Sequence, residues 1–139
     1  MNWKKLLICF VVVYVVIEIL SYLIHAVWLG PTYQSLSEVW RPEAEMQAKQ
    51  WIMFVTAAVW AFFFCYIFAR GYEGKGLAEG VRYGVIIGLF YAIPQAYESY
   101  VIYPIPYYLA LYWFLAGLVV SIICGIVVAL IYKPADAAG

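Results

Sequence analysis

Four long apolar stretches occupy most of this 139-residue chain and limit what it can fold into. They cover approximately residues 6–29, 51–69, 81–97 and 107–132. A helix needs about 20 apolar residues to cross the hydrocarbon layer of a bilayer. A chain this short has too little interior to bury so much apolar surface in water. The pattern therefore predicts an all-α, integral membrane four-helix bundle that forms a single transmembrane domain over residues 1–139.

The composition and the cysteines indicate which partners and metal sites are not expected. Charged residues make up 12% of the chain, whereas soluble domains usually carry about 25%. The net charge is zero and no basic cluster occurs, so nucleic acid is not an expected partner. Cys9, Cys65 and Cys124 all fall within apolar stretches, and no C-x-x-C motif is present. We therefore expect the cysteines to be small core residues and expect no metal site built from them.

The basic residues between the apolar stretches predict how the chain crosses the membrane. An even number of spans places both termini on the same side. That side carries most of the basic residues, which are Lys4, Lys5, Arg70, Lys75, Arg82 and Lys133. The opposite side has only Arg41 and Lys49. Because basic loops stay in the cytoplasm, we expect cytoplasmic termini in a multi-pass protein of a cell inner membrane, with the lipid bilayer as its first partner.

The connection after the first span, residues 30–50, carries two signals for the start of a helix. Ser35-Leu-Ser-Glu38 resembles a capping box, which predicts a short helix at the membrane surface. Pro42 followed by Glu43 and Glu45 is typical of a helix start, because proline fits the first turn and acids favour the positive end of the helix dipole. We therefore expect the second long helix to begin near Pro42, before its apolar part.

Small residues recur at intervals of four in the later spans. The third span has Gly80, Gly84 and Gly88, the fourth has Gly117, Ser121 and Gly125, and the second has a weaker row of Ala57, Ala61, Cys65 and Ala69. This spacing lines one face of a helix and lets another backbone approach closely. We expect these rows to pack spans two, three and four together. A row that serves instead as a homodimer face is the alternative.

The first span has no such row and carries polar side chains on one helix face. They are Tyr14, Glu18, Ser21, Tyr22 and His25. Gln95 and Glu98, near the outer end of the third span, fall at a similar depth when a rise of about 1.5 Å per residue is counted. The sequence therefore predicts a ligand-binding site in the outer half of the bundle, formed by Glu18, Ser21, Tyr22, His25, Gln95 and Glu98.

These polar residues allow three interpretations. Ionisable groups inside a span are functional candidates because placing them there costs free energy, so a pocket for a small molecule or a proton is one. Hydrogen bonds that merely hold the helices together are the second. A metal or haem site is the third, and it is disfavoured because one histidine and two acids supply few ligands. Pro94 removes one backbone hydrogen bond and can kink the third helix beside this region. No motif specifies a cofactor or a substrate.

A resemblance to a known family supports the same architecture. The segment Trp28-Leu-Gly-Pro31-Thr-Tyr33, followed by Trp40, resembles the end of the first span in a bacterial family of small four-span membrane proteins of unknown function. In that family the third span is glycine-rich, as it is from Gly80 to Gly88 here. The resemblance covers nearly the whole chain. It implies the four-helix fold and the membrane location, and it assigns no activity and no role to His25 or Glu98.

Together these features predict a non-enzymatic membrane protein. We expect it to bind a small molecule or a proton in the polar pocket, or to serve as an accessory subunit, as a homodimer or in a larger membrane complex. Two alternatives stay open. One is a membrane enzyme that uses Glu18, His25 and Glu98 as acid/base groups. The other is a purely structural subunit of a membrane complex.

Overall fold

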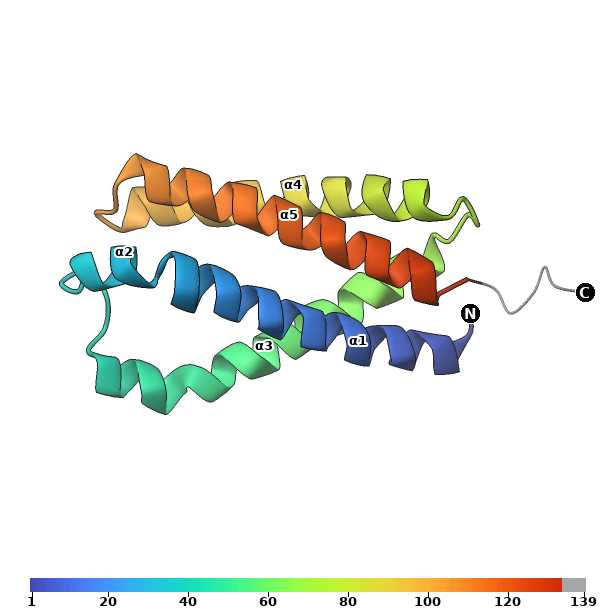
Figure 1. Ribbon diagram of the computed structural model, residues 1–139, viewed down its shortest axis with the longest axis horizontal. Helices are drawn as coiled ribbons and strands as arrows, with labels where there is room; N and C mark the ends of the chain where they lie inside the picture. Colours follow the sequence, from blue (N-terminus) through green and yellow to red (C-terminus); the bar gives the residue numbers. More distant parts are fainter. Residues whose placement is uncertain (134–139) are drawn as a thin grey trace, which may run out of the picture.

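The structure of the chain, a computed structural model that describes residues 1–133, contains helices and no strand within those residues. The helices are α1 (Trp3–Ser21), the π-helix η1 (Tyr22–Trp28), α2 (Gly30–Ser35), α3 (Glu43–Arg70), α4 (Leu77–Ile102) and α5 (Tyr107–Ile131). Four of these segments, α1 with η1, α3, α4 and α5, are long and apolar enough to cross a membrane (Figure 1). The prediction of an all-α fold with four candidate spans is confirmed.

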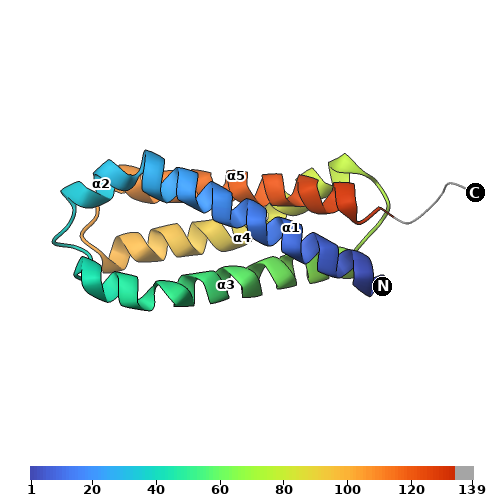
Figure 2. The same ribbon diagram turned by 60° about the horizontal axis from the view of Figure 1, so that its bottom comes forward.

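The bundle has two distinct ends. The N-terminus, the α3–α4 loop and the end of α5 lie together at what we call the terminal end (Figures 1 and 2). The Asn2 backbone N–H donates a hydrogen bond to the Tyr132 hydroxyl at 3.1 Å, which ties the first and last helices there. At the other end, which we call the α2 end, α2 lies near the α4–α5 connection. The four long helices therefore alternate in direction.

The α4 and α5 helices form the closest pair, because small residues let the two backbones meet. A Cβ atom added to Gly84 would lie 2.5 Å from the Ser121 carbonyl oxygen, and one added to Gly117 would lie 2.8 Å from the Ala92 Cβ. Gly80 and Gly125 face each other across the same interface, and Gly88 faces Leu118 and Ser121. Since real Cβ atoms do not approach this closely, the two rows leave no room for larger side chains.

The weaker row on α3 packs against α1. Ala61, Cys65 and Ala69 are buried in one core cluster with Leu6, Cys9 and Val13 of α1, and Cys124 and Val128 of α5 complete it. The prediction that this row packs against the third and fourth spans is therefore wrong in part. The physical reason is that α4 and α5 already cover each other's small-residue faces, so α1 is the main neighbour left for α3.

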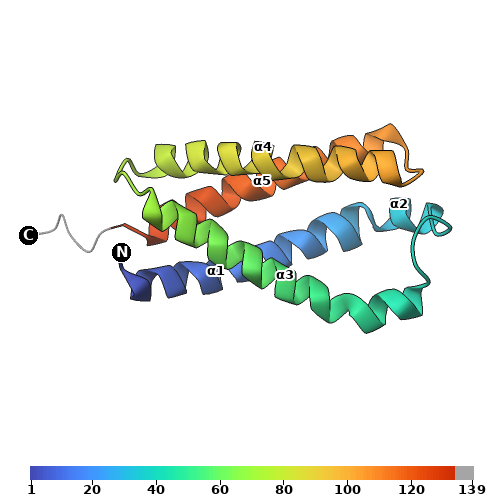
Figure 3. The same cartoon turned by 180° about the vertical axis from the view of Figure 1, so that it is seen from behind.

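The first half of α3 leaves the bundle. From Glu43 to Thr56 every side chain is exposed, and the ribbon of α3 diverges from α4 toward the α2 end (Figures 1 and 3). Its second half is anchored, because the Tyr83 hydroxyl of α4 donates a hydrogen bond to the Phe64 carbonyl at 2.6 Å. The Trp60 and Tyr91 rings, 6.3 Å apart between centroids, mark where α3 and α4 begin to separate.

The connection between the first two spans differs from its prediction in one respect. A short helix is present, but Ser35 ends α2 instead of starting a helix, and its hydroxyl donates to the Thr32 carbonyl at 2.7 Å. Pro31 takes the first turn of α2, the position that suits a residue without an N–H. The capping-box prediction is therefore wrong. The predicted start of the second long helix is confirmed, since α3 begins at Glu43 directly after Pro42.

A buried acid holds the α3–α4 loop, and the sequence analysis did not single it out. Glu79 is only 5% exposed, and its carboxylate accepts hydrogen bonds from the backbone N–H groups of Glu73 at 2.6 Å and Lys75 at 2.8 Å. The Glu73 carboxylate in turn pairs with Lys75 and, at 2.9 Å, with Arg82. Hydrogen bonds from these two cations hold the pKa of Glu73 below its usual range. The loop is thus fixed by its own charged groups.

The α4–α5 interface predicts that two glycine-to-alanine changes differ strongly in their effect on the free energy of unfolding. Gly84→Ala should lower the free energy of unfolding by about 1–3 kcal/mol, the usual cost of overpacking. Gly71→Ala is the matched control, because its added Cβ would lie an ordinary 3.6 Å from the Ile67 carbonyl oxygen, and it should change little. Thermal unfolding in detergent, followed by circular dichroism, measures both. Equal stability of the two variants would contradict this packing.

Candidate functional site

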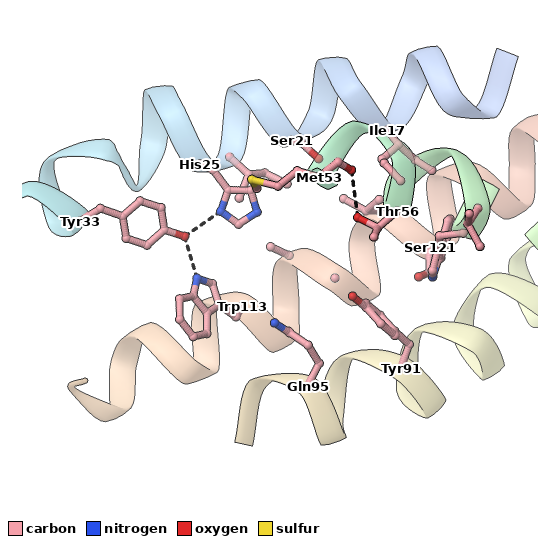
Figure 4. A pocket seen from close by; sticks show the side chains of 17 residues that line it. Ile17, Ser21, His25, Tyr33, Met53, Thr56, Tyr91, Gln95, Trp113 and Ser121 are labelled. Atoms are coloured by element: carbon pink, nitrogen blue, oxygen red, sulfur yellow. Dashed lines mark hydrogen bonds between the residues drawn. The ribbon is translucent and has the colours of Figure 1, made fainter. Parts of the chain in front are cut away.

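A cavity of about 680 Å³ lies between the long helices, where α3 leaves the bundle. This volume is within the range of pockets that hold small molecules, about 300–1,000 Å³. Most of its lining is aliphatic or aromatic, and no Asp, Glu, Lys or Arg among residues 1–133 contributes to it. Its hydroxyl, amide and imidazole groups come from Ser21, His25, Tyr33, Thr56, Tyr91, Gln95 and Ser121 (Figure 4). The site is therefore concave, largely apolar and without formal charge in its lining.

The cavity opens toward the side of the bundle. Met53 on α3 and Tyr91 on α4 both line it, and they are 68% and 48% exposed. Both residues lie within the apolar parts of their helices and not in a loop. The cavity therefore reaches the protein surface between α3 and α4, at the level of the apolar helices.

His25 enters the cavity from the π-helical segment. The Leu29 backbone N–H donates to the Ile24 carbonyl at 2.8 Å, a hydrogen bond that spans five residues where an α-helix spans four. Such wider turns are rare and frequently occur at functional sites. Ser21 and His25 are four residues apart, which is about one turn of either an α-helix or a π-helix. This places both side chains on the face that Ile17 presents to the cavity.

A chain of hydrogen bonds fixes His25. The Trp113 indole N–H of α5 donates to the Tyr33 hydroxyl of α2 at 2.7 Å, and that hydroxyl lies 2.7 Å from Nδ1 of His25 (Figure 4). The Trp40 indole N–H donates to the Tyr33 carbonyl at 3.1 Å and holds the residue from its other side. Burial raises the pKa of the Tyr33 phenol, although the hydrogen bond from Trp113 opposes this. Tyr33 therefore keeps its proton at neutral pH.

These bonds limit which nitrogen of His25 carries a proton. An indole N–H can only donate, so the Tyr33 oxygen accepts from Trp113. With the one hydrogen of the Tyr33 hydroxyl donated to Nδ1 of His25, Nδ1 is unprotonated. A neutral imidazole with a bare Nδ1 carries its hydrogen on Nε2. The ring edge with Nε2 faces the cavity and makes no hydrogen bond within residues 1–133 (Figure 4). With this donation from Tyr33, the cavity presents one oriented N–H donor.

The structure brings together three of the six residues that the sequence analysis placed in the site. Ser21, His25 and Gln95 line the cavity, and the side chains of Glu18, Tyr22 and Glu98 do not. Tyr22 is 65% exposed and Glu98 is exposed as well. Along α1 and η1 the cavity face runs through Ile17, Ser21 and Ile24. Glu18 follows Ile17 by one residue and is therefore turned about 100° away from that face.

The aromatic partners of His25 were not predicted from the sequence. Tyr33 and Trp40 were named only for a family resemblance, and Trp113 was not singled out. A usable signal was present, because a tryptophan in the interior of an apolar span needs a partner for its N–H. Among residues 1–133, no group of three or more His, Cys, Asp or Glu side chains is close enough to hold a metal ion. The chemistry of this site is therefore hydrogen bonding by neutral groups.

No known protein family, curated protein or solved structure matches the chain. The resemblance to the four-span bacterial family stays a prediction. The function therefore has to be argued from the geometry of the cavity.

The hydrogen-bond chain predicts that removing the Tyr33 hydroxyl lowers the free energy of unfolding. Tyr33→Phe leaves the part-buried Trp113 N–H without its partner, and an unsatisfied buried group costs about 1–3 kcal/mol. Tyr22→Phe is the matched control, because Tyr22 of η1 is exposed and does not line the cavity. In thermal unfolding, Tyr33→Phe should lower the melting temperature clearly, and Tyr22→Phe should change it negligibly. Indistinguishable melting temperatures would count against the chain of hydrogen bonds.

Proposed function

We propose that this chain is a multi-pass membrane protein that binds a small lipophilic molecule in the cavity between α3 and α4. The observation that carries the proposal is the sideways opening of an uncharged cavity at the level of the apolar helices. In a bilayer such an opening faces hydrocarbon and not water. A molecule dissolved in the membrane then reaches the cavity directly, without passing through the polar loops at either end.

The distribution of charge supports an orientation with the terminal end in the cytoplasm of a cell inner membrane. Six of the eight basic residues lie at that end, and the other two, Arg41 and Lys49, lie at the α2 end. Trp28, Trp40 and Trp51 gather at the α2 end, which suits the opposite headgroup layer. In this orientation the cavity lies in the outer half of the bilayer, because His25 and Tyr33 are nearer the α2 end.

The alternatives have less support from the same geometry. An acid/base site needs its carboxylates near His25, and Glu18 and Glu98 do not line the cavity. A homodimer through the glycine rows would have to separate α4 from α5, which cover those rows. An accessory role in a larger complex is compatible with ligand binding, since the exposed first half of α3 leaves a face for a partner.

Native mass spectrometry of the protein extracted in mild detergent tests this proposal. Wild type should carry a bound small molecule, and Ala116→Phe should lose it because Ala116 lines the cavity and a phenyl ring would fill it. Leu115→Phe is the matched control, since Leu115 is 44% exposed and lies outside the lining. A wild type without any bound molecule, or an Ala116→Phe variant that retains it fully, would contradict the proposal.

A further inference from the structure

We infer that the molecule bound here is a neutral lipid with a carbonyl group, whose oxygen accepts a hydrogen bond from Nε2–H of His25. The inference rests on the proposed function, because it names the class of ligand that the same cavity takes. It is argued from three properties of the cavity: the free donor, the absence of charge and the apolar space beside the donor.

The first property is the donor, and three polar groups beside it already have partners. The Trp113 N–H and the Tyr33 hydroxyl are used in the chain to His25. The Thr56 hydroxyl donates to the Met53 carbonyl at 3.0 Å. Nε2–H of His25 is left facing the cavity, and the Gln95 amide points into the same space from α4 (Figure 4). A ligand that satisfies His25 has to offer an acceptor, and a carbonyl oxygen is the simplest acceptor a lipid can carry.

The second property, the absence of charge, excludes most membrane headgroups. A phosphate or a carboxylate in the cavity would find no Lys or Arg among the lining residues of the described chain. An ammonium group would find no Asp or Glu there. An unpaired charge in an apolar site costs several kcal/mol or more, roughly the whole affinity of a small ligand. A lipid that would place a phosphate or a carboxylate inside the cavity is therefore disfavoured, whereas neutral esters and quinones carry no such cost.

The third property is the apolar space that continues from His25 toward the terminal end. It is lined by Ile17, Ala57 and Val120 from three different helices. Ile17 lies eight residues before His25, which is about 12 Å along a helix axis. A hydrocarbon chain fits this space with its carbonyl end at His25. Two sources share this chemistry, the neutral ester of a fatty acid and a quinone with an apolar tail.

Two brominated probes test the inference, because Trp60 and Trp113 line the cavity and bromine quenches tryptophan fluorescence. Bromododecane has no acceptor, and methyl bromododecanoate adds one ester carbonyl to the same chain. The chain has six tryptophans, so the Ala116→Phe variant supplies the quenching that arises outside the cavity. Delipidated wild type should bind the ester about fivefold more tightly than the alkane, as expected for one neutral hydrogen bond.

Variants at the donor show whether His25 is the cause of this preference. His25→Phe should bind the two probes equally, and His25→Gln should recover part of the ratio because its amide supplies an N–H. If wild type binds both probes equally, the inference is overturned while the proposed cavity stands. If neither probe gives more quenching in wild type than in Ala116→Phe, the proposed function itself fails.

Competition then separates the two sources of the carbonyl. Decylbenzoquinone and monododecanoylglycerol would each be titrated against methyl bromododecanoate bound to wild type. Displacement by either one supports the inference, and the one effective at lower concentration identifies the source. Displacement by neither overturns the inference.

Discussion

The close approach of α4 and α5 is the constraint on which the rest of the structure depends. Because Gly84 and Gly117 meet the opposite helix without side chains, these two helices cover each other and leave α1 as the partner of α3. Two separate cores result. One lies at the terminal end around Val13 and Phe64, and the other lies at the α2 end around Leu29 and Leu109. The cavity is the space between them that the diverging half of α3 does not fill.

The chain from Trp113 through Tyr33 to His25 gives this space its chemistry. It joins η1 and α2, which follow each other in the chain, to the distant α5, since Tyr33 and Trp113 are 80 residues apart. The same bonds that hold α2 on the bundle also orient His25, and donation from the Tyr33 hydroxyl to Nδ1 leaves the ring hydrogen on the nitrogen that faces the cavity. The contact between Tyr33 and Trp113 and the donor on His25 thus depend on the same hydroxyl. A change in Tyr33 should therefore affect both stability and ligand binding.

The four long helices could be predicted because each needs only a sufficient run of apolar residues, and the start of α3 could be predicted because Pro42 and Glu43 act locally. The site could be predicted only in part. The sequence placed Glu18 on the same face as His25 by assuming a regular α-helix, and the wider turn at Tyr22–Trp28 rotates His25 away from the direction of Glu18. The bond between Trp113 and Tyr33 depends on how distant helices pack, which no local pattern encodes.

The protonation of His25 tests the account most directly, and the chain has only one histidine, so its signals are unambiguous. Nitrogen-15 NMR of the protein in bilayers at neutral pH distinguishes a bare imidazole nitrogen from a protonated one. The account predicts a neutral ring with Nδ1 bare and Nε2 protonated in wild type, and a loss of this fixed state in Tyr33→Phe. A protonated Nδ1 in wild type, in either a neutral or a charged ring, would contradict it.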